Sequence, residues 1–347
     1  MFTLTRQDTA VLKGIAICAM LCHHLYAFPP NTVERYHGLL LWIGILGKIC
    51  VALFLFCSGY GLASHYKPIS LKEDIKFILR RLVKFFANYW VIFAIFVPIT
   101  ILVSHRSLAD AYGQESNVIV CLLRDIMGLQ CYESYNPTWW FNQLIIILYL
   151  LFPLLYRVVY IKPWLAILVG IVITLAHLYI PYNPADICTW QLPFVIGIVW
   201  KLYEAKFPTS QEWISNHKYV FAISSLALMI VLIIIRMYPI IPHWKGVKVD
   251  GFLSCAIALC VVSMLRYMQY VSAALAFLGK HSINIYLTHT FVNAFWCPQL
   301  LHTGEWMRGG GNFIVLMIIC LLVSIIIEFL KEKIRFYELV NIITKHI

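Results

Sequence analysis

Apolar segments of about 20 residues recur along the whole chain, and they constrain its fold more than any other feature. A helix of that length crosses a bilayer and satisfies its own backbone hydrogen bonds. Composition agrees, because 61% of the 347 residues are hydrophobic and only 12% are charged. We therefore expect an all-α polytopic membrane protein, a single bundle of about ten transmembrane helices. The predicted spans are 11–28, 38–63, 86–104, 139–157, 163–181, 187–203, 219–238, 250–267, 274–297 and 312–330.

The basic residues indicate how these helices are oriented. Cytoplasmic loops of membrane proteins accumulate Lys and Arg. With the N-terminus inside, most of the 27 Lys and Arg residues fall on the cytoplasmic side, and Lys48 and Arg236 are ambiguous. We therefore expect both termini to be cytoplasmic. No repeat, low-complexity tract or flexible linker divides the sequence, so residues 1–347 are predicted to form one membrane domain.

The net charge of +11 does not indicate a nucleic-acid partner, because membrane topology and anionic lipid account for basic residues scattered over inner loops. Most of the 11 cysteines lie in apolar segments, where Cys acts as a small hydrophobic residue. Cys121 and Cys131, both in the predicted outer loop 105–138, are the pair able to form a disulfide. No CxxC or HExxH motif is present, so no bound metal or cofactor is expected.

The first apolar segment carries ionisable groups at both ends. Lys13 and His24 are eleven residues apart, about 16 Å along a helix, and share one face. An ionisable residue inside a span is costly unless it faces a partner or a water-filled cavity, so function is the default explanation for His24. The side chain of His23 points about 100° away around the helix, and a satisfied interfacial histidine explains it more simply.

Two further clusters lie toward the predicted cytoplasmic side. Ser58, Gly59 and Tyr60 occupy a place where small residues allow close approach, either of a ligand or of a neighbouring helix. One and a half helical turns of the next apolar segment hold three cations that can form a phosphate clamp or an anchor to anionic lipid. These cations are Arg80, Arg81 and Lys84.

Polar side chains return in the ninth apolar segment. Ser282, Tyr286 and His289 are spaced by four and three residues and fall on one helix face. A second intramembrane histidine with hydroxyl neighbours favours a polar pathway through the membrane. The long outer loop is followed by Trp139 and Trp140, which can stack on sugar rings or anchor the chain at the interface.

The order of these motifs resembles the membrane acyltransferases of the acyltransferase 3 family, which includes bacterial O-acetyltransferases of surface polysaccharides. The resemblance covers essentially the whole chain. Lys13 and His24 match an arginine and a histidine with the same spacing in that family, and "LFLFCSGY" ending at Tyr60 is similar to its second-span pattern. Other matching positions are Arg80, Arg81 and Lys84; Trp139 or Trp140, Tyr149 and Pro153; and Leu278, Gly279, Ser282, Tyr286, Leu287 and His289.

Two departures from the family pattern stand out. Lysine replaces the usual arginine at position 13, which keeps the charge and loses the guanidinium fork. Ala52 stands where many members carry an aspartate. No further domain follows the last span, so the resemblance implies the stand-alone form of the enzyme.

The resemblance implies an acyl-CoA-dependent O-acyltransferase in the bacterial cytoplasmic membrane. Acyl-CoA, most simply acetyl-CoA, is the expected donor, and a glycan or lipid-linked sugar on the outer side is the expected acceptor. His24 is the expected catalytic residue, either as a base or as an acyl carrier. The other implied site residues are Lys13, Ser58, Tyr60, Arg80, Arg81 and Lys84 for the donor; Ser282, Tyr286 and His289 along the pathway; and Trp139 and Trp140 on the acceptor side.

A transporter of a small acid or an acylated metabolite is the alternative function. Inverted repeats and broken helices in corresponding positions would favour transport, and the sequence shows no convincing example. A non-catalytic scaffold would need neither the cation cluster nor two intramembrane histidines. Acetyl is the expected acyl group, with succinyl as the alternative.

Overall fold

The computed structural model describes residues 3–28, 36–113, 117–129, 134–180, 183–204, 216–238, 246–302 and 310–347. Regular secondary structure in these residues is helical throughout, so the predicted all-α class is confirmed. Seven helical stretches are long and apolar enough to cross a membrane, and each coincides with a predicted span. They are Arg6–Ala27, Gly38–Ala63, Leu71–Ser104, Pro137–Ile161, Lys218–Met237, Asp250–Tyr267 and Gly311–Lys333.

Three of the ten predicted spans take another form. Helices α8 (Pro163–Ala176) and α9 (Ile187–Tyr203) have 14 and 17 residues, fewer than the length of about 20 that a span requires. The predicted span 274–297 is divided, because α13 (Gln269–Lys280) ends before a turn at His281 and α14 (Ser282–Thr290) follows it. The total of ten spans therefore stays a prediction.

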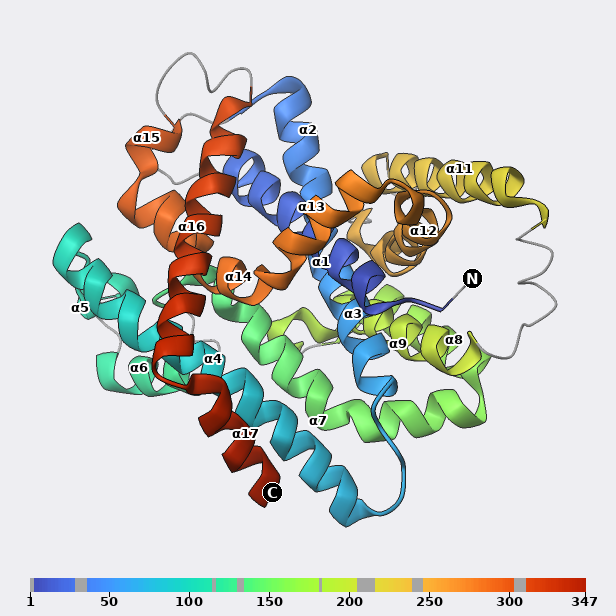
Figure 1. Cartoon of the computed structure of the whole chain (residues 1–347), viewed down its shortest axis with the longest axis horizontal. Coiled ribbons are helices and arrows are strands. Elements are labelled where there is room, and N and C mark those ends of the chain that lie inside the picture. The colour runs from blue at the N-terminus through green and yellow to red at the C-terminus, as the bar shows by residue number, and fades with distance from the viewer. Residues whose placement is uncertain are drawn as a thin grey trace. The chain divides into compact units, whose positions relative to one another are not determined.

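The chain folds into two compact units, whose helices are labelled in Figure 1. Helices α1 (Arg6–Cys22), α2 (Gly38–Gly47) and α7 (Trp140–Ile161) each begin in one unit and end in the other. Unit 1 comprises Met1–Met20, Ile45–Pro68 and Leu151–Lys280, and unit 2 comprises Leu21–Gly44, Ile69–Leu150 and His281–Ile347.

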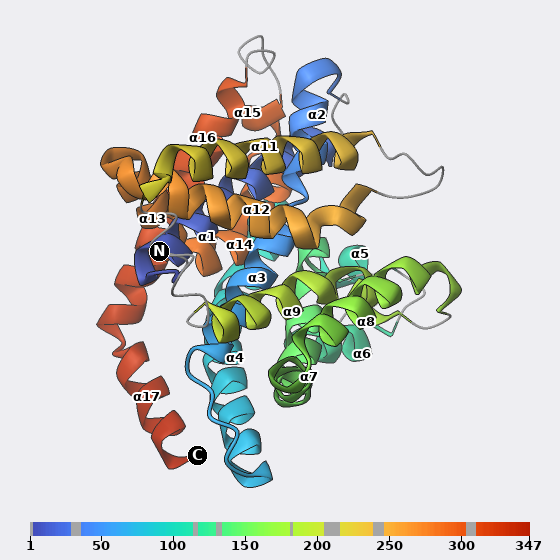
Figure 2. The ribbon, with the colours of Figure 1, turned by 90° about the vertical axis from the view of Figure 1, so that its right-hand side faces the viewer.

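Helices of unit 1 pack in pairs. Helix α3 (Cys50–Ala63) packs along α9, and α8 packs on α9 (Figure 2). Helix α11 (Lys218–Met237) runs beside α12 (Asp250–Ser263) in the same view. The short helices of this unit are η3 (His177–Tyr179), η4 (Pro184–Asp186), η5 (Gly246–Val249) and η6 (Leu265–Tyr267).

Glycines bring two helix pairs of unit 1 into backbone contact. A Cβ atom on Gly59 would overlap the carbonyl oxygen of Phe194, and one on Gly197 would overlap that of Phe56. Helices α3 and α9 therefore cross so closely that these positions have room only for glycine. Of the two alternatives for the small residues around position 59, close helix packing therefore holds for Gly59. Its neighbour Ser58 is half-buried.

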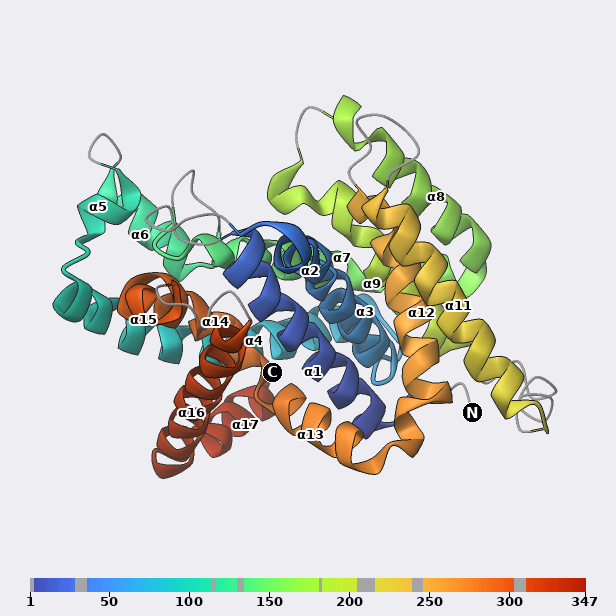
Figure 3. The same ribbon diagram turned by 90° about the horizontal axis from the view of Figure 1, so that it is seen from above.

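Glycines also bring α1 into backbone contact with α13, and the two helices lie side by side in Figure 3. A Cβ atom on Gly14 would overlap the carbonyl oxygen of Leu275, and one on Gly279 would overlap that of Ala10. Gly279 belongs to the late motif that resembles the acyltransferase pattern. The crossing explains why a glycine stands at position 279, because the backbone of α1 leaves no room there for a side chain.

Arg236, which charge counting left ambiguous, forms a buried ion pair in unit 1. Its Nε and Nη2 atoms donate to the Asp250 carboxylate at 2.6 and 3.3 Å, and both side chains are almost fully buried. Its Nη1 donates to the carbonyl oxygen of Ile45 at 3.1 Å, near the end of α2. The arginine thus balances a buried carboxylate and satisfies a carbonyl group close to the break between α2 and α3.

Unit 2 is built around α4 (Leu71–Ser104), which packs against α14 and against the π-helical turn η7 (Phe291–Trp296). Helix α16 (Gly311–Lys333) packs on α14, and α17 (Phe336–His346) packs on α4 and α16 (Figure 1). The remaining elements of this unit are η1 (His23–Ala27), α5 (Leu108–Tyr112), α6 (Val118–Ile126), η2 (Pro137–Trp139) and α15 (Pro298–His302).

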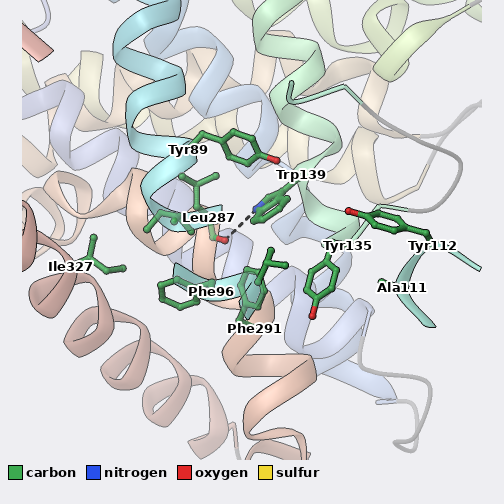
Figure 4. Close-up of a cluster of buried hydrophobic side chains, with 11 residues drawn as sticks. Tyr89, Phe96, Ala111, Tyr112, Tyr135, Trp139, Leu287, Phe291 and Ile327 are labelled. Carbon is green, nitrogen blue, oxygen red and sulfur yellow. Dashed lines mark hydrogen bonds between the residues drawn. The ribbon is translucent and has the colours of Figure 1, made fainter. Parts of the chain in front are cut away.

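An aromatic cluster forms the core of unit 2 (Figure 4). The Trp139 ring packs edge-on against Tyr89 at 5.0 Å between centroids and against Phe291 at 5.7 Å. Its indole Nε1 donates to the carbonyl oxygen of Leu287 at 3.2 Å, the bond drawn in Figure 4. This cluster fixes the end of η2 against α14, the helix that carries His289.

Candidate active site

Helix α4 presents the basic cluster predicted from the sequence. Ser70 caps the helix by accepting a hydrogen bond from the backbone of Glu73 at 3.3 Å. The helix has 34 residues and is about 51 Å long at 1.5 Å per residue, well beyond the roughly 30 Å of a hydrocarbon core. Its first turns can therefore project from the membrane with their charges: Arg80 and Arg81, both half-buried, and Lys84, which is exposed.

The basic cluster is tied to α16 by Lys331, one residue beyond the predicted span 312–330. Lys331 is fully buried, and its Nζ donates at 2.8 Å to Asn88 Oδ1 and to Asn284 Oδ1. The amide of Asn88 in turn donates to the carbonyl oxygen of Lys84 at 2.8 Å. Lys331 therefore joins α4, α14 and α16 one turn from Lys84.

A carboxylate completes this polar network. Glu328 Oε1 accepts from Asn284 at 2.6 Å and from Lys331 at 3.2 Å, and Tyr337 of α17 donates to the other carboxylate oxygen. Ser324, one turn earlier on α16, contacts His281 Nδ1 at 2.9 Å. Pairing with Glu328 offsets the cost of burying the Lys331 charge.

His24 and His289 lie against each other in unit 2. Their ring centroids are 4.8 Å apart with the planes tilted by 49°. His24 is half-buried, whereas its neighbour His23 is buried and its Nδ1 lies 2.8 Å from the carbonyl oxygen of Gly44. The partial exposure of His24 is consistent with the preference for His24 over His23 as the reactive residue.

Both histidines adjoin π-helical turns that end in the same way. Phe28 donates to the carbonyl of His23 at 3.2 Å and Cys297 donates to that of Val292 at 3.1 Å, both five residues back. Phe28 and Cys297 each precede a proline in the sequence, and both leave the helical region, with φ of −133° and −128°. A residue before proline is pushed out of the α conformation. π-Helical turns of this kind are frequent at functional sites.

The ring of His289 has a defined tautomer. Its Nδ1 lies 2.8 Å from the carbonyl oxygen of Tyr286 and 3.2 Å from that of Ile285, so Nδ1 carries the proton and Nε2 is the acceptor. Thr290 Oγ1 lies 3.4 Å from this Nε2 and 3.0 Å from the hydroxyl of Thr138. His289 therefore offers a lone pair within a chain of hydroxyl groups.

The other predicted pathway and acceptor residues lie around the same helix. Ser282 begins α14 and is half-buried, and Tyr286 donates to Asn142 Oδ1 at 2.9 Å. Trp139 is buried in the aromatic cluster, and Trp140 is half-buried. The structure thus brings His24, the α14 residues and Trp139 together in unit 2, and their functional roles stay predictions.

Three predicted donor residues belong to unit 1. Lys13 and Ser58 are half-buried, on α1 and α3 respectively. Tyr60 is buried, and two acceptors lie within hydrogen-bond distance of its hydroxyl: Glu204 Oε2 at 2.9 Å and the carbonyl oxygen of Leu4 at 3.0 Å. Lys201 pairs with the same Glu204 and lies 5.3 Å from the Tyr60 ring centroid.

Sequence reasoning missed two polar residues beside the histidine pair, one in contact with His24 and one in contact with the first. Asn293 donates from Nδ2 to the carbonyl oxygen of His24 at 3.3 Å, and His302 Nε2 lies 2.9 Å from Asn293 Oδ1. Asn293 is one turn after His289, so it shares the face that was identified from Ser282, Tyr286 and His289. Extending that face by four residues was the signal that could have found it. His302 lies in a short segment without periodicity.

Two sequence predictions concern sites of other kinds. Cys131 lies outside the described residues, so its pairing with Cys121 stays a prediction. Within the residues that the structure describes, no group of three or more His, Cys, Asp or Glu side chains is arranged to hold a metal ion.

Comparison with known proteins decides the family. The family model for the acyltransferase domain of the acyltransferase 3 family matches residues 10–330. The chain belongs to the acyltransferase 3 family. Both histidines and the basic cluster of this acyltransferase lie within the matched residues, and with its seven membrane-crossing candidates it is an integral membrane protein. Among curated proteins and solved structures, comparison found no match to the chain.

Proposed function

We propose that this acyltransferase moves an acetyl group from cytoplasmic acetyl-CoA to a hydroxyl group of an extracytoplasmic or lipid-linked glycan, in the cytoplasmic membrane of a bacterium. One observation carries the proposal. His24 and His289, from opposite ends of the matched region, stand with ring centroids 4.8 Å apart among hydroxyl groups. General acid–base catalysis of acyl transfer needs a histidine in such a setting.

The chemistry assigns one proton to His24. The sugar hydroxyl loses its proton to the neutral imidazole of His24 as its oxygen attacks the thioester carbonyl, and a C–O bond forms. The C–S bond then breaks, and the imidazolium returns the proton to the departing thiolate. The products are the O-acetyl ester and CoA with a free thiol, so the reaction consumes no other proton or electron. Formation of an acyl-histidine followed by transfer is the alternative order.

The donor binds at the basic cluster of α4 in this proposal. Arg80 and Arg81 are guanidinium groups, which bind phosphate oxygens in pairs of hydrogen bonds, and Lys84 adds a third charge. Asn88 and Lys331 support the proposal, because they fix the backbone of that turn against α14 and α16. The resemblance adds Lys13, Ser58 and Tyr60 as further donor residues.

The acceptor and the topology complete the proposal. The acyltransferase has ten spans in one membrane domain with both termini in the cytoplasm, so acyl-CoA meets α4 from the inside. Ser282, Tyr286 and His289 orient the reacting groups, and Trp140 with Trp139 behind it faces the sugar. Membrane lipid surrounds the spans, and the catalytic steps use protein side chains alone.

The test is transfer of labelled acetyl from acetyl-CoA to glycan by purified, reconstituted protein. We expect His24→Ala to lower transfer by at least the 10²–10⁴-fold that general-base catalysis contributes, with binding of acetyl-CoA retained. His23→Ala is the matched control and should keep most of the transfer, because His23 is held by Gly44 and is buried. Near-wild-type transfer by His24→Ala would show that the proposed mechanism is wrong.

Transport without bond chemistry is the second candidate function. The interruption between α2 and α3 and the turn at His281 between α13 and α14 favour it, because broken helices mark the binding sites of many transporters. The same reconstitution separates the two functions. Label that crosses the membrane without ever appearing in a covalent product would replace the enzymatic proposal by transport.

A further inference from the structure

Five side chains of unit 2 form a ring of hydrogen bonds that begins and ends on the turn carrying His24. Tyr26, on η1, donates to Asn312 Oδ1 at 3.0 Å, and Asn312 Nδ2 donates to the hydroxyl of Tyr36 at 2.8 Å. Tyr36 contacts His302 Nδ1 at 3.4 Å. His302 and Asn293 then complete the path to the carbonyl oxygen of His24, two residues before Tyr26.

The hydrogen bonds of the ring are consistent with one tautomer of His302. Asn293 Nδ2 donates to the carbonyl oxygen of His24, so Oδ1 faces His302 and accepts from its Nε2. With the proton on Nε2, Nδ1 of the neutral imidazole can accept from the hydroxyl of Tyr36, which itself accepts from Asn312. The bond from His302 keeps the Asn293 amide oriented with Nδ2 toward His24.

The surroundings of the ring favour the same state. Tyr26, Asn293, His302 and Asn312 are each at most 5% exposed, and Tyr36 is half-buried. Burial lowers the pKa of His302 to about 4, so the imidazole is neutral over the physiological range. Asn312 also donates to the carbonyl oxygen of Leu301, which ties the start of α16 to α15.

The ring explains how a wide helical turn can hold a side chain in one position. The π-helical turn at His23–Ala27 departs from the regular α-helical hydrogen-bond pattern, and two hydrogen bonds from outside the helix hold it. The Asn293 amide donates to the carbonyl oxygen of His24 near the start of the turn, and the Tyr26 hydroxyl donates to Asn312 near its end. Together they set the direction in which the His24 ring leaves the backbone.

We propose that His302 and Asn293 are positioning residues that hold the His24 imidazole in its reactive orientation through this hydrogen-bonded ring. The inference rests on the proposed role of His24 as base or acyl carrier. It assigns a role in acyl transfer to two residues with no part in donor binding. Their loss therefore lowers turnover and leaves the affinity for acetyl-CoA unchanged.

The test measures kcat, the KM for acetyl-CoA and acetyl-CoA binding of the full chain in liposomes. Removing both bonds of the imidazole with His302→Leu should lower kcat on the order of 10²-fold, the cost of misplacing a reacting group by about 1 Å. The KM for acetyl-CoA should change less than about twofold, since donor binding is separate. His302→Gln should recover most of the lost kcat, because its amide can donate to Asn293 and accept from Tyr36.

A matched pair of tyrosine variants separates positioning from stability. Tyr26→Phe and Tyr89→Phe each remove one hydroxyl from a tyrosine that is at most 3% exposed in unit 2. Tyr26 belongs to the ring, whereas Tyr89 donates to the backbone of Asp125 in the aromatic cluster. Tyr26→Phe should lower kcat between about twofold and tenfold, the range that one hydrogen bond corresponds to. Tyr89→Phe should leave kcat unchanged.

Two results would overturn the inference. One is unchanged kcat in both His302→Leu and Tyr26→Phe. The other is a result with two parts: His302→Gln and His302→Leu lose kcat equally, and Tyr26→Phe and Tyr89→Phe also lose kcat equally. That result would assign a purely structural role to the hydrogen-bonded ring. His24→Ala is measured alongside. Full transfer by that variant would refute the proposed function itself, whereas its loss together with full activity of the ring variants would refute only the positioning role.

Discussion

Asp125 is a carboxyl group near the end of helix α6, buried among tyrosines. Its Oδ2 accepts from the Tyr112 hydroxyl at 2.9 Å and from the backbone of Tyr135 at 2.7 Å, and the residue is 2% exposed. Burial raises the pKa of Asp125 above its ordinary 3.8, because desolvation outweighs these hydrogen bonds. Its contribution to stability is therefore complete below about pH 4 and is lost as pH rises through the folded-state pKa.

Asp125→Asn should remove this pH dependence. An amide oxygen can accept both hydrogen bonds and has no charge to desolvate. We expect the unfolding temperature of the variant, relative to wild type, to increase as pH rises from 4 to 8, measured by thermal unfolding in detergent. Asp110→Asn is the control, because hydrogen bonds from Ser107 lower the pKa of the exposed Asp110, and its effect should be constant above about pH 4. A constant difference for Asp125→Asn would contradict the prediction.

Single residues of the site differed in how well the sequence revealed them. His24 became a candidate because Lys13 and His24 share a face of one helix and an ionisable residue inside a span is costly, and its catalytic role stays a prediction. Asn293 extends the helical face of His289 by one turn, but its contact with His24 spans 269 residues, and His302 contacts Asn293 from a short segment without periodicity. The burial of Lys331 against Asn88 and Asn284 could not be predicted, because charge counting does not detect burial.

At the scale of helices, two glycines of α3 test how closely α3 and α9 must pack. Gly59 and Gly61 lie two residues apart on α3, and only Gly59 meets the backbone of α9. Gly59→Ala should force the helices apart and lower the free energy of unfolding by about 1–3 kcal/mol, the usual cost of overpacking. Gly61→Ala has open space around its Cβ and should be neutral or stabilise by up to about 1 kcal/mol, because Ala favours helix.

The measurement is thermal unfolding and yield of folded protein for the two variants in the same detergent. Equal behaviour of Gly59→Ala and Gly61→Ala would mean that α3 and α9 can separate without cost. That outcome would remove the packing explanation for the small residues around position 59. It would also reopen the alternative that a ligand approaches the backbone there.

Elements were predicted best where apolar length alone defines them. Seven spans follow from hydropathy because each helix must cover the thickness of a bilayer. The interruptions were not predictable, since the break at Lys48 depends on Arg236 reaching Ile45, and the turn at His281 on a contact with Ser324. The prolines after Phe28 and Cys297 were visible, but the choice of a π-helical turn before each depends on the opposing helix.

At the scale of the whole molecule, the number of crossings determines where the two ends lie. An odd number, such as the seven long helices, places the termini on opposite sides of the membrane, whereas ten place them on the same side. The basic residues favour the second arrangement, because Lys333, Arg335 and Lys345 follow the last span and are exposed. The short helices α8 and α9 and the divided segment of α13 and α14 would then supply the three further crossings.

Reporter fusions test this topology directly. A reporter before Met1 and one after Ile347 should both be cytoplasmic, and one inserted after Gly113 should be external. Gly113 is suited to this test because it caps α5 beyond the C-terminal end of α4, whereas Lys72 lies in the first turn of α4. Alkaline phosphatase, active only outside, and a fluorescent protein that folds inside should report opposite signals at each site. An external C-terminus together with a cytoplasmic N-terminus would mean an odd number of crossings, and at least one of α8, α9 and the divided α13–α14 segment would then not cross the membrane.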